Sequence, residues 1–217
     1  MILAVVVGPR SQPSANQLID RTAYVLCGPL PLFVSDGLDS YGVALLDRYQ
    51  VTVSYPPTGK RGRPRSPEKR PVADLRYAQV VKKRERGRLV SVSKRIVYGD
   101  DSSIASDDIT TSLVERLNLT LRRENSTLQR KTLSFAKDEE ELKAHLALQV
   151  AYYHFVRPHL SLREDIPGGL EKTPPCRWRK RTPAMAAKIT DHVWSLREML
   201  TFRPHITSTN YRVITHN

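Results

Sequence analysis

Cysteine is scarce in this chain of 217 residues. The two cysteines, Cys27 and Cys176, lie far apart and have no CxxC or paired-histidine spacing near them. This pattern excludes a disulfide framework and the usual spacing of a zinc site. We expect both to be ordinary buried or partly buried thiols in a reducing cytosol.

Long hydrophobic runs are also absent. The longest, from Ile2 to Val7, is far shorter than the roughly 20 apolar residues that a transmembrane helix needs. It also lacks the basic start and the following hydrophobic region of a signal peptide. We therefore expect a cytoplasmic protein without membrane attachment.

Acidic residues are few relative to basic ones. The chain has 35 lysines and arginines against 22 aspartates and glutamates, for a formal net charge of +13 and a pI near 10.0. Between Thr58 and Arg95 alone, 14 basic and 3 acidic residues leave 14 − 3 = +11. This concentration favours contact with the phosphates of a nucleic acid.

A short motif in this basic segment, Lys60-Arg61-Gly-Arg63-Pro-Arg65, has the form of an AT-hook. Glycine and proline favour an extended backbone, which would let Arg61 and Arg63 lie along a narrow A·T minor groove. The same side chains could equally bind phosphates without reading the groove. Lys60, Arg61, Arg63 and Arg65 are candidate DNA contacts under both interpretations.

The first part of the chain alternates between strand and helix patterns, which predicts an α/β fold. Strands are expected at residues 2–7, 30–34 and 51–55, with helices at 14–26 and 40–49. The run at 2–7 is β-branched and continuous, which is typical of a strand buried on both faces. Inward positions would include Ala15, Ile19, Val43 and Leu45.

The composition changes at residue 56, where five prolines fall within residues 56–71 and predict an unpacked loop. Strand patterns at 75–81 and 89–98, with a turn near Arg86-Gly87, predict a hairpin that has Val90, Val92, Ile96 and Tyr98 on one half-buried face. An acidic loop (100–111) and two helices, from residue 112 and over 138–156, complete a core of residues 1–160. Residues 56–100 would be its insertion, and 161–217 a basic tail with a short helix near 183–199.

Two carboxylates have positions that suit a site. Asp36 follows a strand at the end where open α/β sheets gather ligand-binding groups, although it could merely be a turn residue. Glu115 could form a capping box with Ser112. On the same helix, however, Glu115, Asn118 and Arg122 share a polar face, whereas Val114, Leu117, Leu121 and Leu128 form an apolar stripe. This polar face would suit a metal beside a phosphate backbone.

Several segments, in order along nearly the whole chain, resemble insertion-sequence DDE transposases of the retroviral integrase type. Phe33-Val-Ser-Asp36-Gly-Leu-Asp-Ser-Tyr41 resembles their second-aspartate segment, and Val114-Glu115-Arg-Leu-Asn118-Leu-Thr-Leu-Arg122-Arg123 their glutamate helix. The next similar segments are Arg130-Lys131-Thr-Leu-Ser-Phe-Ala-Lys137, Tyr152-Tyr-His-Phe-Val-Arg-Pro-His159-Leu-Ser-Leu162 and Thr182-Pro-Ala-Met185.

This resemblance implies a ribonuclease H-like mixed sheet with flanking helices. It implies phosphoryl transfer on double-stranded DNA with two divalent cations, Mg²⁺ or Mn²⁺, held by two aspartates and one glutamate. Asp36 would be the second aspartate and Glu115 the glutamate. Asn118, Arg122, Arg123 and Lys131 would contact DNA, and a homodimer or a transposase partner is expected.

The family's first aspartate has no counterpart here. The only acidic residue before Asp36 is Asp20, which falls inside the first expected helix. We therefore expect an N-terminally truncated chain that lacks the first strand or strands of the fold and has no detectable strand-transfer activity.

Two other functions stay open. One is a non-catalytic DNA-binding fragment that interferes with an intact transposase, which would need the basic segment but neither carboxylate. The other is a ribonuclease H-like nuclease or a basic RNA-binding protein. It is less favoured because aromatic residues, at 7%, are too few for a base-stacking platform.

Overall fold

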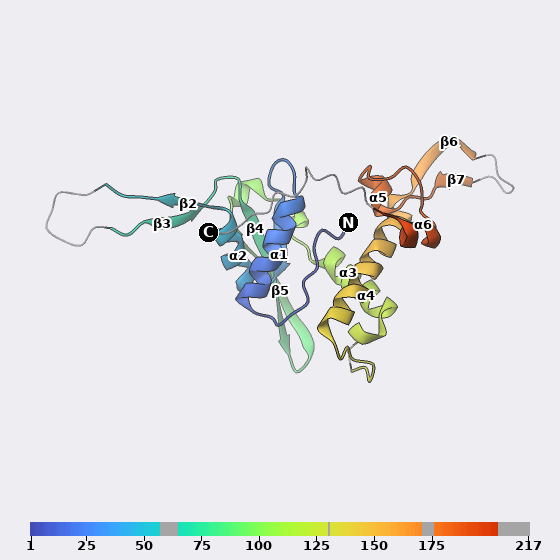
Figure 1. The fold of residues 1–217 in the computed structure, drawn as a ribbon. Helices are drawn as coiled ribbons and strands as arrows, with labels where there is room; N and C mark the ends of the chain where they lie inside the picture. Colours follow the sequence, from blue (N-terminus) through green and yellow to red (C-terminus); the bar gives the residue numbers. More distant parts are fainter. Residues whose placement is uncertain (57–64, 130, 171–175, 204–217) are drawn as a thin grey trace. The chain divides into compact units, whose positions relative to one another are not determined.

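A computed structural model of the chain describes residues 1–56, 65–129, 131–170 and 176–203 (Figure 1). The chain divides into two compact units, one of residues 3–142 and the other of residues 1–2 with 143–217. Both candidate carboxylates belong to the 3–142 unit. The division into a 1–160 core and a 161–217 tail stays a prediction.

The 3–142 unit is built on a three-stranded mixed sheet with the order β1-β4-β5. Strand β1 (Leu32–Asp36) pairs in parallel with β4 (Arg76–Glu85), and β4 pairs antiparallel with β5 (Arg88–Tyr98). The expected hairpin is therefore present, and its first strand is the centre of the sheet. A mixed α/β architecture is confirmed.

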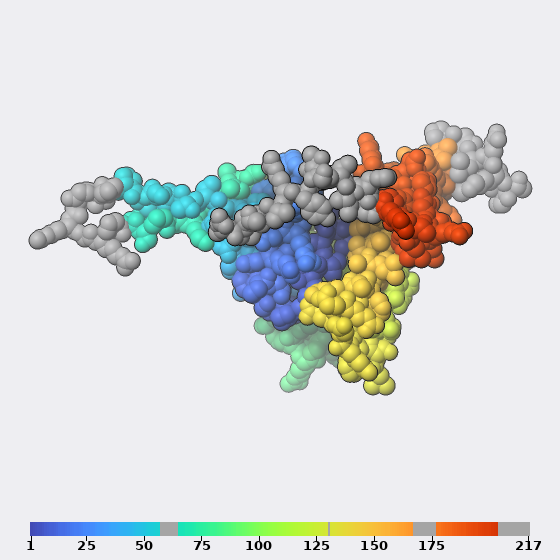
Figure 2. All heavy atoms as spheres, in the orientation of Figure 1, coloured from blue at the N-terminus to red at the C-terminus, as the bar shows by residue number. Residues whose placement is uncertain are grey.

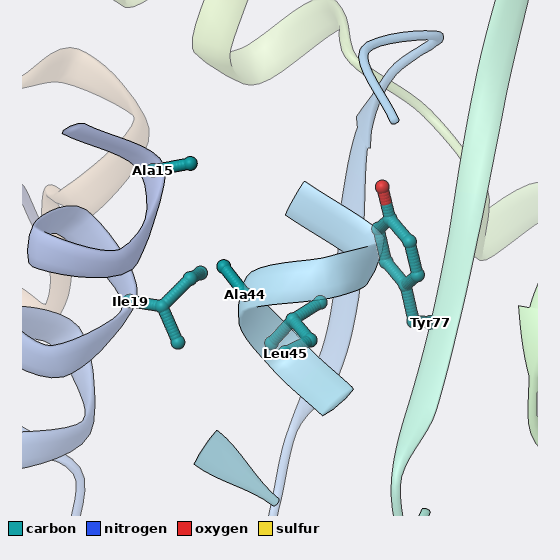
Figure 3. Close-up of a cluster of buried hydrophobic side chains, with 5 residues drawn as sticks. All are labelled: Ala15, Ile19, Ala44, Leu45 and Tyr77. Atoms are coloured by element: carbon teal, nitrogen blue, oxygen red, sulfur yellow. The ribbon is translucent and has the colours of Figure 1, made fainter. Parts of the chain in front are cut away.

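Two helices cover one face of this sheet. Helix α1 (Gln12–Val25) has Pro13 in its first turn, and α2 (Ser40–Arg48) follows β1 directly. Ala15 and Ile19 of α1 pack towards Ala44 and Leu45 of α2, which lie between α1 and Tyr77 of β4 (Figure 3). These five residues form a core of the unit.

The opposite face is covered by the segment predicted to be an acidic loop. It forms two 3-10 turns, Asp101–Ser103 and Ser106–Asp108. Ile104 and Ile109 beside these turns pack on Ala78 and Val80 of β4, with Leu32, Val34 and Ile96 around them. Because the segment is mostly polar, its sequence did not predict that Ile104 and Ile109 are core residues.

Several expectations about local structure are wrong. Residues 2–7 form no strand, and no described strand pairs with them. Val43 is 48% exposed, and Ala44 takes its place in the core. Val90 and Val92 are about half exposed, because this part of the hairpin extends beyond the residues that pair with β1. Ile96 and Tyr98 point to opposite faces of the sheet, because the register of β4 and β5 is irregular near Tyr77.

Further elements lie outside the sheet. Strand β2 (Gln50–Val53) pairs antiparallel with β3 (Glu68–Pro71), and α3 (Ser112–Glu124) is followed by a 3-10 turn, Ser126–Leu128. Helix α1 ends before Cys27, whose side chain is exposed, contrary to the expected burial. The predicted second long helix is α4 (Glu139–Ala151), with its last turn, Tyr152–Val156, in π-helical form.

The described C-terminal residues hold more regular structure than the predicted basic tail with one short helix. A 3-10 turn, Leu160–Leu162, precedes an antiparallel ribbon of β6 (Glu164–Leu170) and β7 (Cys176–Arg179). Two short helices, α5 (Pro183–Ala186) and α6 (Leu196–Thr201), replace the single helix predicted near 183–199.

Candidate functional site

Asp36 is the last residue of β1, and its carboxylate is exposed at the carboxyl end of the strand. One oxygen, Oδ2, lies 3.6 Å from Nη2 of Arg10, which precedes α1. The other, Oδ1, accepts a long hydrogen bond of 3.4 Å from the backbone N–H of Leu38. Asp36 is thus both a turn residue and a carboxylate open to a ligand, since 60% of its side chain is exposed.

Glu115 lies in the first turn of α3, where Thr111 is the N-cap residue. Its Oε1 accepts hydrogen bonds from Nζ of Lys82 and, at 2.7 Å, from Oγ1 of Thr111. The capping box with Ser112 is therefore not formed. The Lys82 ammonium, and next the Thr111 hydroxyl, hold the pKa of Glu115 below its ordinary value.

Strand β4 connects the two carboxylates. Asp36 pairs with Val80, and Lys82 follows two residues later, about 7 Å along the strand. Side chains alternate along a strand, so Asp36 is on the same sheet face as Val34, and Lys82 is on the same face as Val80. This is the face on which Ile104 and Ile109 pack. Asp36 and the cation that holds Glu115 thus lie at the same end of the same sheet.

Each carboxylate has its own basic partner, Arg10 for Asp36 and Lys82 for Glu115. Within the described parts of the chain, no group of three or more histidine, cysteine, aspartate or glutamate side chains could hold a metal ion. Asp20 lies inside α1 as expected, with its Oδ1 3.8 Å from Nε of Arg48. The site is therefore a pair of carboxylates set among cations.

The predicted AT-hook is described only at its end. Lys60, Arg61 and Arg63 lie outside the described residues. The guanidinium of Arg65 stacks 3.8 Å from the ring centre of Tyr55, and its Nη2 lies 3.4 Å from Oε2 of Glu68. Arg65 is thus held against residues of, or next to, the β2–β3 strand pair.

The predicted DNA contacts of α3 are partly open to solvent. Asn118 and Arg123 are exposed and Arg122 is half-buried, as expected for a polar face at the surface. Lys131, beyond the helix, is exposed and has a positive φ of 56°. The apolar stripe is less buried than predicted, because Val114 is 47% exposed while Leu117 and Leu121 are half-buried.

Two later segments of the resemblance, residues 152–162 and 182–185, contact one another in the other unit, where α5 packs on the turn Tyr152–Val156. The backbone N–H of His159 donates to the carbonyl of Arg181 at 2.9 Å, and the rings of Tyr153 and His159 lie 4.4 Å apart. Thr182 caps α5 by accepting from the N–H of Met185. These contacts explain the spacing of the segments without assigning them a chemical role.

Sequence reasoning missed Lys82 and Arg10 as partners of the carboxylates. Lys82 is one of many cations in the basic segment, and only the register of β4 against β1 distinguishes it. Arg10 lies outside every element, in the turn before α1.

Replacing Lys82 with methionine is expected to raise the pKa of Glu115 towards 4.5, its ordinary value, because the largest cause of its depression is removed. Titration of the carboxyl carbon by NMR would measure this shift. Lys83→Met, which removes the adjacent lysine that pairs with Glu85 instead, is the control. Equal pKa values of Glu115 in the wild type and in Lys82→Met would show that the two side chains do not interact.

No family model matches this chain, and neither a curated protein nor a solved structure does. Among the residues that the structure describes, no helix has both the length and the apolar character needed to cross a membrane.

Proposed function

We propose that this chain carries part of a DNA phosphoryl-transfer site of the DDE transposase type, in which Asp36 and Glu115 are two of the metal-binding carboxylates. The observation that carries the proposal is the position of Lys82, which binds Glu115 of α3 and lies on β4 two residues beyond Val80, the strand partner of Asp36. The order of the sequence segments supports the retroviral integrase-like family and a ribonuclease H-like fold. Duplex DNA is the proposed partner, alone or with a second transposase chain, in the cytoplasm.

The two carboxylates fit Mg²⁺ or Mn²⁺ in their chemistry, since both ions prefer oxygen ligands. When bound, such ions would activate a nucleophile and stabilise the leaving oxygen. The chain's own contribution is to present Asp36 and Glu115 and to place cations beside them. For the carboxylates to bind a metal ion, Arg10 must separate from Asp36 and Lys82 from Glu115. The two basic side chains could then pair with the phosphate oxygens of the DNA.

Strand transfer by the 217-residue chain is proposed to be undetectable. Among its described residues, no group of three or more histidine, cysteine, aspartate or glutamate side chains could hold a metal ion. Two carboxylates hold a pair of divalent ions less tightly than three, because fewer charged oxygens offset the cost of removing metal-bound water.

A second candidate is a DNA-binding protein without catalysis. It is favoured by the observation that Asp36 and Glu115 each already have a basic partner. In this role the carboxylates would only position Arg10 and Lys82, and divalent ions would not be needed.

The response of DNA binding to divalent ions separates the two functions. In the proposed site, Mg²⁺ strengthens binding of a fluorescent duplex to the wild-type chain relative to EDTA at equal ionic strength, because it offsets the carboxylate charges facing phosphate. Asp36→Asn and Glu115→Gln are expected to abolish this response, whereas Asp47→Asn, an exposed residue paired with Lys69 elsewhere, retains it. A wild-type affinity that is equal in Mg²⁺ and EDTA would instead favour the non-catalytic protein.

A further inference from the structure

The outer part of the β4–β5 hairpin extends beyond the rest of the sheet. Strand β1 pairs only with residues Arg76–Val80, so from residue 81 onward β4 has β5 as its one described neighbour. Every residue from 81 to 95, here called the distal ribbon, is exposed. In Figures 1 and 2 the end of the hairpin, in green, protrudes past helix α1.

The distal ribbon is strongly basic. It contains seven lysines and arginines and one acidic residue, Glu85, for a net charge of 7 − 1 = +6. Glu85 is itself paired with Lys83, at 3.1 Å. Charged residues on an exposed strand discourage aggregation, but a few would suffice for that purpose. The density of one sign of charge points to a polyanionic partner.

Apolar residues are exposed on the same ribbon. Leu89, Val90 and Val92 of β5 are 52%, 55% and 50% exposed, and Ser91 and Ser93 lie between and after the two valines. An isolated two-stranded ribbon has little stability of its own in water. Exposed apolar side chains on such a ribbon are stabilised when another molecule covers them. The uncharged residues from 89 to 93, which lie between clusters of cations, therefore indicate a surface that a partner covers when it binds.

The shape of the ribbon selects a binding mode. Arg86 and Gly87 both have positive φ values, 49° and 80°, and join the strands by a tight two-residue turn. Two strands about 4.8 Å apart form a narrow ribbon. A two-stranded ribbon can enter the major groove of B-form DNA, about 12 Å wide, whereas the minor groove, about 6 Å wide, is too narrow.

We propose that the distal ribbon enters the major groove of duplex DNA. Arg84, Arg86 and Arg88 around the turn contact phosphates, while Val90 and Val92, which share one face of β5, face the base edges. This inference rests on the proposed function only in its choice of DNA as the polyanion. Because Lys82 lies at the base of the ribbon and contacts Glu115, a duplex held in this way has its backbone near the carboxylate pair.

The phosphate contacts are tested by neutralising the tip in the full chain with Arg84→Gln, Arg86→Asn and Arg88→Gln. Asparagine is chosen at 86 because it tolerates a positive φ. We expect duplex affinity near 0.1 M salt to fall roughly tenfold or more and the salt slope of log K to decrease by about 2.7, since each lost phosphate contact contributes about 0.9. A control with the same charge change, Lys137→Gln with Lys180→Gln and Arg197→Gln, should change both values much less.

The groove is tested with a duplex in which uracil replaces thymine, which removes a methyl group from the major groove alone. We expect the wild type to bind this duplex less tightly, by about fourfold for each thymine methyl in contact. Val90→Ser with Val92→Ser should bind both duplexes equally, with an unchanged salt slope. If this variant fails to fold, as judged by circular dichroism, the affinities of the wild-type chain for the two duplexes still show whether the major groove is contacted.

Two results would overturn the inference. They are equal wild-type affinity for the thymine and uracil duplexes, and equal binding of the duplex and of single-stranded RNA of the same charge. Neither of these bears on Asp36 and Glu115, whose response to Mg²⁺ is measured with the separate variants of the carboxylates. Failure of the ribbon inference and failure of the proposed function are therefore distinguishable.

Discussion

Replacing Leu45 with alanine is expected to lower the free energy of unfolding of the 3–142 unit by about 2–5 kcal/mol, the range for removing a leucine from a packed core. Leu45 is 1% exposed and lies on α2 between α1 and Tyr77 of β4. Urea unfolding of the full chain, followed by circular dichroism, would measure the loss. A stability close to that of the wild type would show that the helices do not pack on the sheet in this way.

Val43→Ala is the matched control on the same helix. Val43 was predicted to face inward, but it is 48% exposed. We expect this substitution to change the free energy of unfolding by only about 0.5 kcal/mol, as is usual for surface positions. Equal losses for the two variants would restore the inward prediction for Val43.

The core also matters for the candidate site. The hydroxyls of Ser35 and Tyr77 are hydrogen-bonded at 2.7 Å, and Ser35 immediately precedes Asp36. Gln79 Nε2 donates to the Tyr77 hydroxyl at 2.8 Å, which fixes the ring further. Packing of Leu45 and Tyr77 therefore holds the end of β1, from which the Asp36 carboxylate is presented.

Hydrophobic periodicity predicted most of the elements of the 3–142 unit correctly. Helices at 14–26 and 40–49 and strands at 30–34, 75–81 and 89–98 all match observed elements within a few residues. These predictions succeeded because local amphipathic patterns and the Arg86-Gly87 turn are properties of short segments. The strand predicted at 2–7 failed because β-branched residues suit a sheet only where neighbouring strands supply partners.

Longer-range features could not be predicted in the same way. That β4 is the central strand depends on which strand pairs with β1, and both hairpin strands have similar patterns. The roles of Ile104 and Ile109 were hidden because two apolar residues in a polar segment give no periodicity. The carboxylates themselves were identified from strand ends and helix faces. Lys82, in contrast, emerged only from the register that sets it beyond Asp36, and Arg10 only from its contact with Asp36.

Removing either carboxylate is expected to abolish divalent metal binding at the candidate site. Asp36→Asn and Glu115→Gln keep the shape of each side chain and remove the charge that attracts the ion. Because the proposed site is shared, loss of either charge should affect the same ion. Exposed carboxylates that pair elsewhere, Asp47 with Lys69 and Glu85 with Lys83, provide the controls Asp47→Asn and Glu85→Gln.

The most direct test is a Mn²⁺ titration of the full chain, in which the free ion is followed by its electron paramagnetic resonance signal. The wild type and both controls should remove Mn²⁺ from solution through a common weak site. Asp36→Asn and Glu115→Gln should each lose that site, and their combination should lose no more than either alone. Equal Mn²⁺ binding by the wild type and both carboxylate variants, or no binding by any of them, would contradict a shared metal site at Asp36 and Glu115.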